Sequence, residues 1–253
     1  MPSHVYDCII CANAAARGGV AEKGEQSESE RICSWYNHSK KSYRIDNDNA
    51  MDFVSFVPET MAPRDAYRLL VSSVVPRPIG WASTIGADGS VNLAPFSFFN
   101  AVGGPTPFVM ISVSRRAGAI KDTLRNASET GEMVLNIVDE DLAPQMNITS
   151  GDWSYGDNEF ERAGLAAAPS VDVRPPRVAA APVAMEVKVT QIVPVEGSSY
   201  TMIIGRVVRF HIRRDLLRPD GTVDPLRLRP VARLSGDEYA RLGEVFTLER
   251  PGA

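Results

Sequence analysis

The sequence predicts a mainly β protein, organised as a barrel with short peripheral helices. Five or six short runs rich in β-branched and aromatic residues follow one another at regular spacing, with turn-forming residues between them. The helical patterns between these runs are brief, which disfavours a doubly wound sheet with long crossover helices. No repeat of roughly 20–50 residues is visible, so a solenoid is not expected.

The first fifty residues differ in character from the rest of the chain. They contain all three cysteines and the polar run of residues 22–30, and they show no sustained helical or strand period. A segment so polar cannot bury enough apolar surface to offset its ordering entropy, so we expect residues 1–50 to be disordered or weakly ordered. A second possibility is that the native chain starts at Met51 and that this extension is non-native. The predicted organisation is therefore an N-terminal extension, residues 1–50, and one domain, residues 51–253.

The cysteines of the extension allow two interpretations. Cys8, Cys11, Cys33 and His38 have the residue types of a zinc site with three cysteines and one histidine. The second half lacks a close pair of cysteines, so we favour incidental cysteines and predict no metal site. No cysteine lies beyond residue 33, so the main body needs no oxidising compartment, and we expect a cytoplasmic protein.

From Met51 onward the pattern becomes regular. Residues 63–71 predict a helix, with a proline at an early position and an aspartate in the first turn. Two β-rich runs, residues 79–85 and 91–96, flank a turn with an Asp-Gly pair at residues 86–90 and therefore predict a hairpin.

The later elements are predicted by the same kinds of signal. A helix over residues 119–130 is closed by Gly131. A polar segment with several aromatic residues then interrupts the strands over residues 139–169. The other predicted elements are strands at residues 107–113, 132–138, 182–194 and 200–212, a short helix near residues 158–163, and a turn at residues 196–198.

Composition and missing motifs narrow the possible functions. The net charge of -4 disfavours a nucleic-acid partner, and no apolar run reaches the roughly 18 residues of a membrane helix. Neither a Gly-x-Gly-x-x-Gly motif nor a Walker loop is present. His211 is the only histidine of the main body, and we interpret it as a strand residue whose ring packs against its neighbours. We therefore predict no catalytic side chain and expect a cofactor to supply the chemistry.

The first candidate binding motif covers residues 76–84. Two prolines precede a strand that carries paired hydroxyl groups, Ser83 and Thr84, close to a tight turn. Hydroxyl and backbone N–H groups at a strand end can bind a phosphate. An ordinary hydrophobic strand remains the alternative interpretation.

The second motif covers residues 92–100. Pro95 lies inside an apolar run, and a proline there takes backbone groups out of the strand ladder. Those groups could face the polar edge of a planar ring, with phenylalanines as apolar walls. A core-forming edge strand is the alternative.

The third motif is Lys121-Asp122-Thr123 near the start of a predicted helix. A lysine charge, a threonine hydroxyl and the N–H groups of a helix start together make an anion site. Asp122 would oppose a phosphate if it pointed inward, so we expect it to cap the helix or to pair with a neighbouring arginine. Surface charge is the alternative interpretation of this motif.

Together these segments resemble the flavin reductase-like family, which includes flavoredoxin and the reductase components of two-component monooxygenases. The resemblance extends over most of residues 60–248. One departure is Ser235, which stands where related sequences often carry a second glycine. The resembling motifs are residues 76–84 (PRPIGWAST), 92–99 (NLAPFSFF), 121–123 (KDT) and 131–137 (GEMVLNI), with a C-terminal echo at residues 233–239 (RLSGDEY).

The resemblance implies a six-stranded split β-barrel, usually a homodimer, with FMN near the subunit interface. It implies that Ser83 and Thr84 lie near the ribityl-phosphate and that Lys121 and Thr123 bind the phosphate. Asp122 matches the motif but would contribute through its backbone. The residues implied to line the isoalloxazine ring are Trp81, Ala82, Ala94, Pro95, Phe96 and Ser97.

The activity implied by the resemblance is that of an NAD(P)H-dependent flavin oxidoreductase. Hydride would pass from NADH or NADPH to FMN, and reduced flavin would serve a partner monooxygenase or another electron acceptor. Backbone N–H groups around residues 94–97 would stabilise the negative charge that develops on the ring. Two alternatives stay open: a flavoredoxin-type electron-transfer protein with tightly bound FMN, and a non-redox ligand-binding barrel.

Overall fold

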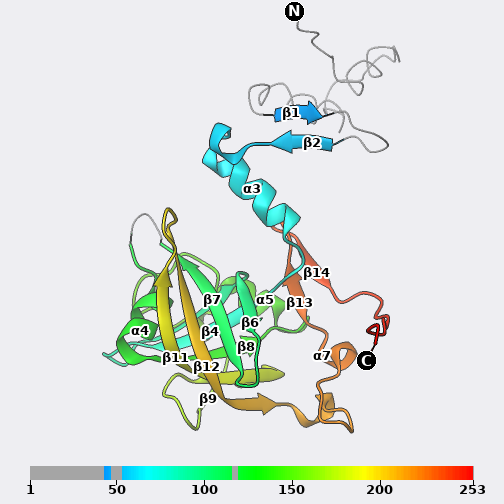
Figure 1. The fold of residues 1–253 in the computed structure, drawn as a ribbon. Coiled ribbons are helices and arrows are strands. Elements are labelled where there is room, and N and C mark those ends of the chain that lie inside the picture. Colours follow the sequence, from blue (N-terminus) through cyan, green and yellow to red (C-terminus); the bar gives the residue numbers. More distant parts are fainter. Residues whose placement is uncertain (1–42, 47–52, 116–118, 253) are drawn as a thin grey trace, which may run out of the picture. The chain divides into compact units, whose positions relative to one another are not determined.

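The structure is a computed structural model of the 253-residue chain, and it describes residues 43–46, 53–115 and 119–252 (Figure 1). The chain divides into two compact units, Met1–Leu70 and Val71–Ala253. The sequence placed the boundary after residue 50, whereas the units meet within the helix α3 (Pro63–Ser73).

The first unit contains a two-stranded hairpin. Strand β1 (Tyr43–Asp46) pairs antiparallel with β2 (Phe53–Phe56), and the short helix η1 (Pro58–Thr60) follows. Strand β1 lies inside residues 1–50, the segment for which the sequence predicts disorder or weak order. The rest of that segment and Met51 lie outside the described residues, as do the zinc-site candidates Cys8, Cys11, Cys33 and His38.

The second unit is built around one antiparallel sheet of seven strands. In spatial order the strands are β5-β4-β8-β11-β12-β7-β6. Their bounds are β4 (Gly80–Ile85), β5 (Val91–Phe96), β6 (Phe99–Val102), β7 (Phe108–Ser114), β8 (Glu132–Ile137), β11 (Val183–Pro194) and β12 (Tyr200–Ile212).

A bend between β5 and β6 turns this sheet into a barrel. The two strands stand at opposite ends of the sheet order, yet only two residues separate them in the chain. The backbone N–H of Ser112 in β7 donates to the carbonyl of Phe98 inside the bend at 2.8 Å. Gly80 in β4 permits the close approach of β6, because a Cβ there would lie 2.8 Å from Cγ of Phe99. The same bent segment thus joins both edges of the sheet.

Apolar side chains pack on both faces of the barrel wall. Inside, Ile111, Leu135 and Ile203 are fully buried, and the helix α4 (Asp122–Thr130) contributes Leu124 and Ala127 to this cluster. On the outer face a second cluster, which we call the outer cluster, packs beneath α5 (Ala143–Ile148) and α6 (Glu159–Arg162). The buried residues of the outer cluster are Ile79, Trp81, Leu93, Val138, Leu142, Met146, Phe160, Val178 and Val231.

A smaller sheet flanks the barrel. The strands β3 (Arg77–Pro78), β13 (Val231–Arg233) and β14 (Tyr239–Arg241) pair in the order β14-β13-β3. The guanidinium group of Arg77 donates to the carbonyls of Val71, Val74 and Leu234 at 2.5, 2.7 and 2.6 Å. The remaining short elements are β9 (Ala167–Ala168), β10 (Arg177–Val178), η2 (Arg214–Leu216) and α7 (Pro225–Leu228).

The predicted fold class is confirmed, with differences in detail. The structure is mainly β and forms a barrel, but the sheet has seven strands rather than six. The additional strand is β6, for which the sequence predicted no element. The predicted helix over residues 119–130 begins only at Asp122 and ends at Gly131, whose φ of 68° suits glycine. Within the described part of the chain, no helix is long and apolar enough to span a membrane.

Candidate functional site

Two side-chain hydrogen bonds join β4 and β5, which carry the first two sequence motifs, to α4. Asn126 Nδ2 in α4 donates to Thr84 Oγ1 in β4 at 3.2 Å. Asn92 Nδ2 in β5 donates to Thr123 Oγ1 at 3.0 Å. All four side chains are buried, and Thr84 and Asn92 are register partners across the two strands. The packing of α4 on the barrel is therefore specified by a buried polar network.

The charged residues of the third motif lie at the N-terminus of the same helix. Lys121 is the N-cap residue of α4, and its ammonium group lies 5.9 Å from the centre of the Phe96 ring. Asp122 forms the ion pair with Arg125 that the sequence suggested, at 3.6 Å. A lysine, a threonine hydroxyl and the first N–H groups of a nine-residue helix thus lie together, which is an arrangement suited to an anion.

The predicted ring-lining residues divide between the two faces of the barrel wall. Along β4 the side chains alternate, so Ala82 belongs to the inner cluster and Trp81 to the outer one. Trp81 is fully buried, and its indole Nε1 donates to Thr149 Oγ1 at 2.8 Å. The predicted site residues that are partly exposed are Ala94, Pro95, Ser97, Lys121 and Asp122. Trp81 and Ala82 are fully buried, on opposite faces of the wall.

Ser83 differs from Thr84 in its surroundings. Its Oγ atom is buried and has no hydrogen-bond partner among the described residues, and the same holds for Oδ1 of Asn126. Buried polar atoms normally find a partner, so these two atoms mark places where the polar network is incomplete. Ser83 lies on the same face of β4 as Trp81, so of these two atoms only Oδ1 of Asn126 belongs to the network at α4.

The sequence analysis missed Asn92 and Asn126 as members of this network. Asn126 follows Thr123 by three residues, which places both side chains on one face of the helix. Asn92 was within the second motif but was not singled out. The helical spacing was the available signal for Asn126, whereas its partner on β4 depends on how α4 packs.

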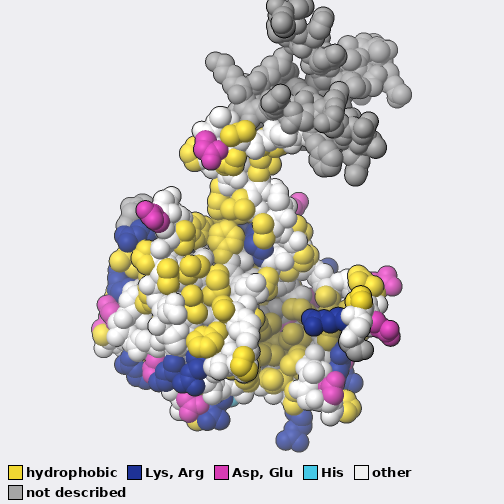
Figure 2. Space-filling view, viewed as in Figure 1, with side chains coloured by type: hydrophobic (Ala, Val, Ile, Leu, Met, Phe, Trp, Pro, Cys, Tyr) yellow, Lys and Arg dark blue, Asp and Glu magenta, His cyan; other side chains and the backbone are white. Residues whose placement is uncertain are grey.

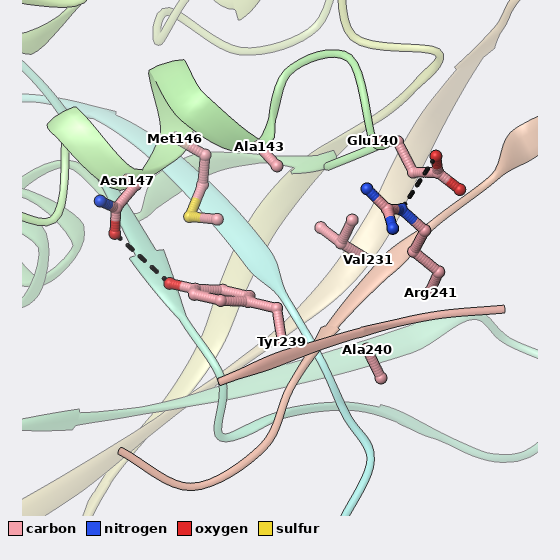
Figure 3. Close-up of a pocket in the computed structure, with 8 residues that line it drawn as sticks. All are labelled: Glu140, Ala143, Met146, Asn147, Val231, Tyr239, Ala240 and Arg241. Carbon is pink, nitrogen blue, oxygen red and sulfur yellow. Dashed lines mark hydrogen bonds and ion pairs between the residues drawn. The ribbon is translucent and has the colours of Figure 1, made fainter. Parts of the chain in front are cut away.

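A pocket of about 520 Å³ lies beside the smaller sheet (Figure 3). Its floor is apolar, and Met146 and Val231 connect it to the outer cluster that also contains Trp81. Figure 2 shows the molecule hollowed beside the C-terminal segment, with hydrophobic side chains at the bottom of the hollow. The residues that line the pocket are Glu140, Ala143, Met146, Asn147, Val231, Tyr239, Ala240 and Arg241.

Polar contacts at the rim of the pocket hold its walls in place. Arg241 Nε lies 3.3 Å from Glu140 Oε2, and the hydroxyl of Tyr239 donates to Asn147 Oδ1 at 3.5 Å (Figure 3). The guanidinium group of Arg233 lies 4.6 Å from the centre of the Tyr239 ring. None of the predicted site residues lines the pocket, but Tyr239 belongs to the C-terminal echo of the resembling motifs.

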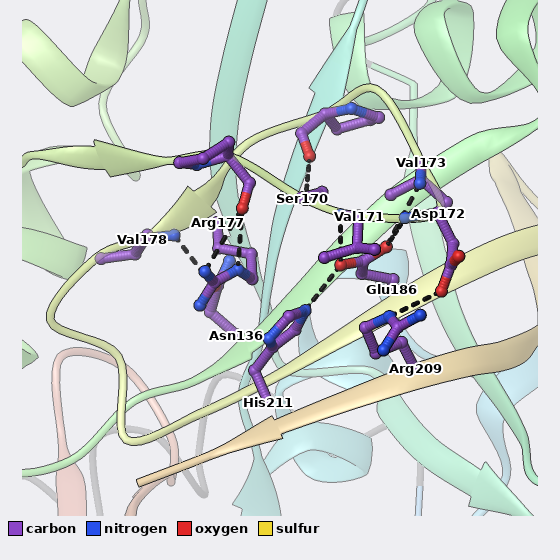
Figure 4. A network of polar contacts seen from close by, with 12 residues as sticks. Asn136, Ser170, Val171, Asp172, Val173, Arg177, Val178, Glu186, Arg209 and His211 are labelled. Atoms are coloured by element: carbon purple, nitrogen blue, oxygen red, sulfur yellow. Dashed lines mark hydrogen bonds and ion pairs between the residues drawn. The ribbon is translucent and has the colours of Figure 1, made fainter.

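A separate polar network surrounds Glu186 on β11 (Figure 4). This buried carboxylate accepts hydrogen bonds from the backbone N–H groups of Val171, Asp172 and Val173 at 2.8, 2.5 and 3.2 Å. From the sequence, we interpreted His211 as a residue whose ring packs against its neighbours. In the structure, His211 Nε2 also makes a polar contact with Glu186 Oε1 at 2.6 Å. Burial acts to raise the pKa of Glu186, but the hydrogen bonds from His211 and the backbone hold it below its ordinary value. The network anchors the loop over residues 171–173.

Comparisons with known proteins agree on one family. The model of the flavin reductase-like domain matches residues 71–227. An uncharacterised protein of Halalkalibacterium halodurans is 40% identical over 199 residues, which are 77% of this chain and 95% of the relative.

Two solved structures are similar in both sequence and fold. Nitrilotriacetate monooxygenase component B from Bacillus cereus is 37% identical, with a TM-score of 0.76 over 79% of this chain and 100% of the other. The 2-nitrobenzoate 2-nitroreductase NbaA from Pseudomonas fluorescens is 30% identical, with a TM-score of 0.71 over 78% of this chain and 96% of the other.

Proposed function

This chain belongs to the flavin reductase-like domain family, and from that premise we propose that it is an oxidoreductase that binds FMN by its phosphate and takes hydride from NADH or NADPH. The observation that carries the proposal is the convergence of the three motifs around α4. FMN would supply the two-electron redox chemistry that the side chains of this chain cannot supply themselves.

The phosphate is assigned to the start of α4. Lys121 provides the positive charge there, and the hydroxyl of Thr123 can donate because Asn92 occupies its oxygen as the donor. The hydroxyl of Thr84 likewise receives a hydrogen bond from Asn126 and keeps its own proton to donate. Ser83 lies on the opposite face of β4, beside its register partner Leu93 of the outer cluster, so the donors at α4 are Lys121, Thr84 and Thr123. This set fits an anionic phosphate.

The isoalloxazine ring is assigned to the bend between β5 and β6. Ala94, Pro95 and Ser97 are partly exposed there, and Phe96 lies behind them in the core. Pro95 is the register partner of Trp81 in β4, but it has no N–H group and donates no hydrogen bond to the sheet ladder. We propose that the backbone N–H groups of this bend stabilise negative charge at the polar edge of the ring.

The pocket beside the smaller sheet is the candidate site for the second reactant. An apolar floor with an aromatic wall and a few polar groups suits a planar ring that carries an amide, such as nicotinamide. Through Met146 and Val231 the pocket shares the outer cluster with Trp81.

The partner and the setting follow from the relatives. Because one relative is named as component B of a monooxygenase, we propose that reduced flavin is passed to a partner oxygenase or another acceptor. We also keep the expectations of a homodimer and of a cytoplasmic location as parts of this proposal.

The decisive experiment is an absorption spectrum of the purified protein with FMN, followed by anaerobic titration with NADH and with NADPH. We expect tight FMN binding and bleaching of the flavin bands by one or both nicotinamides. Bound FMN that neither nicotinamide reduces would instead favour an electron-transfer protein. A protein without affinity for FMN would favour a non-redox barrel.

A further inference from the structure

The edge of strand β5 is completed by a buried carboxylate. Strand β5 stands at one end of the sheet order, and Leu93 is the register partner of Ser83 in β4. The backbone N–H of Leu93 donates to Glu159 Oε2 at 2.9 Å. In an antiparallel pair the N–H groups point alternately toward the partner strand and away from it, so this one faces the open edge. Glu159 thus occupies the place of a missing neighbouring strand.

Packing and capping of the helix α6 fix the position of Glu159. Glu159 is only 5% exposed, and the next residue, Phe160, packs in the outer cluster with Leu93. Asn158 caps the helix α6 by accepting a hydrogen bond from the N–H of Phe160 at 3.1 Å. Arg162 pairs with Asp157 at 2.8 Å, which ties the preceding loop to the same helix. The position of Glu159 relative to Leu93 is therefore set by packing.

The surroundings of Glu159 raise the pKa of its carboxyl group to near neutrality. Burial is the main cause that raises the pKa of Glu159 to about 7, and the hydrogen bond from Leu93 opposes the rise only in part. Negative charges from two other elements raise the pKa further: Asp122 in the first turn of α4 and Asp157 in the preceding loop. The contact that β5 makes with the Glu159 carboxylate is the hydrogen bond from the backbone N–H of Leu93.

We propose that Glu159 couples FMN binding to proton uptake: as a positioning residue it holds β5 at Leu93, and its negative charge, with that of Asp122, opposes the phosphate at the start of α4. This inference rests on the proposed function. Coupling between two sites is reciprocal, so a bound phosphate favours the protonated form of Glu159 and the ionised form weakens phosphate binding. Leu93 keeps its hydrogen-bond acceptor in either form.

The test compares the wild type with Glu159→Gln, which keeps an oxygen for the N–H of Leu93 but carries no charge. Dissociation constants for FMN and for riboflavin are measured between pH 6 and 9. For the wild type, we expect FMN binding to weaken by roughly five- to twentyfold as the pH rises through 7, a range typical of coupling between sites. For Glu159→Gln, FMN binding should not weaken as the pH rises through 7, and it should be tighter than that of the wild type at pH 8.

Riboflavin and a second variant serve as controls. Riboflavin lacks the phosphate, so its binding should show the same pH profile in the wild type and in Glu159→Gln. Glu161→Gln removes an exposed charge from the same helix and keeps an oxygen for Asn158 Nδ2. It should change FMN affinity by less than roughly twofold, because exposed charges are screened. Calorimetry in buffers of different ionisation enthalpy should show more proton uptake for the wild type at pH 7 than for Glu159→Gln.

The outcomes separate this inference from the proposed function. If both proteins bind FMN with the same pH profile, or if Glu159→Gln weakens FMN and riboflavin equally at every pH, the coupling is refuted and FMN binding stands. If the wild type does not bind FMN at all, the proposed function fails and the inference fails with it.

Discussion

At the residue scale, the candidate site depends on side chains that serve two needs at once. Thr84 and Thr123 accept hydrogen bonds that hold α4 against the sheet, and in the proposed function their hydroxyl protons are donated to the phosphate. Lys121 adds the charge at the helix start. Trp81 shows the opposite case, because its indole N–H is used inside the protein and its ring is wholly buried.

Replacing Lys121 with alanine should weaken FMN binding. The change removes a charge-assisted contact with the phosphate, worth roughly 1.5–3 kcal/mol, or about a tenfold to 150-fold loss of affinity. Fluorescence titration of FMN measures the loss. Arg214→Ala removes one positive charge at an exposed position in η2 and should leave the affinity nearly unchanged. Equal affinities for wild type and Lys121→Ala would remove Lys121 from the site.

Replacing Thr149 with valine should destabilise the protein. Thr149 Oγ1 accepts from the Trp81 indole at 2.8 Å and donates to the carbonyl of Met146 at 2.8 Å. Valine keeps the shape but leaves the buried indole N–H without an acceptor, which costs about 1–3 kcal/mol of unfolding free energy. Urea unfolding measures the difference. Thr149→Ser keeps the hydroxyl and should lose less; a larger loss in Thr149→Ser would contradict this explanation.

At the element scale, single carboxylates hold segments that have no regular secondary structure of their own. Glu159 completes the edge of β5, and Glu186 collects the N–H groups of the loop over residues 171–173 (Figure 4). Predicted strands and helices matched most observed elements, because hydrophobic period and turn residues act locally. The sequence did not predict β13 and β14, which are short and depend on the pairing of β13 with β3.

The stability of the protein should fall in acid through Glu186. Its pKa is lowered in the folded state, so its ionised form stabilises the fold above the unfolded pKa of about 4.5, and this contribution is lost as the pH falls through the folded pKa. We expect Glu186→Gln to lose about 1–3 kcal/mol at pH 7, and the difference from wild type to shrink toward pH 3. Urea unfolding of both proteins across this pH range measures the difference in their free energy of unfolding.

An exposed carboxylate provides the control for this pH dependence. Asp215 is 60% exposed in its ion pair with Arg213, and such pairs contribute little. Asp215→Asn should therefore follow the wild type at every pH. A gap between wild type and Glu186→Gln that stays constant from pH 7 to pH 3 would show that the charge of Glu186 is not what stabilises the loop.

At the scale of the whole molecule, the barrel is closed by one bent segment that also carries the proposed ring site. The bend between β5 and β6 is fixed by its pairing with β4 on one side and β7 on the other. A ligand seated there and at α4 would contact elements from both edges of the sheet. Binding should therefore stabilise the folded barrel as a unit.

FMN should raise the melting temperature much more than riboflavin does. A ligand at a hundred times its dissociation constant adds about 2.7 kcal/mol, which corresponds to roughly 5–10 °C for a unit of this size. Riboflavin at the same concentration lacks the phosphate contacts at α4 and should give a clearly smaller shift. Differential scanning fluorimetry or calorimetry measures both. Equal shifts would mean that the phosphate contributes nothing to binding.

The sequence by itself determined the mainly β class, the hairpin over β4 and β5, the ends of several elements and the three motifs of the candidate site. These depend on signals within a few residues, such as alternation, turn chemistry and the glycine that ends α4. Only the tertiary structure decided that Asn126 meets Thr84, that Trp81 faces Thr149 and that Glu159 reaches Leu93. Alternation in a strand states which face a side chain occupies, but its partner is set by the packing of elements distant in sequence.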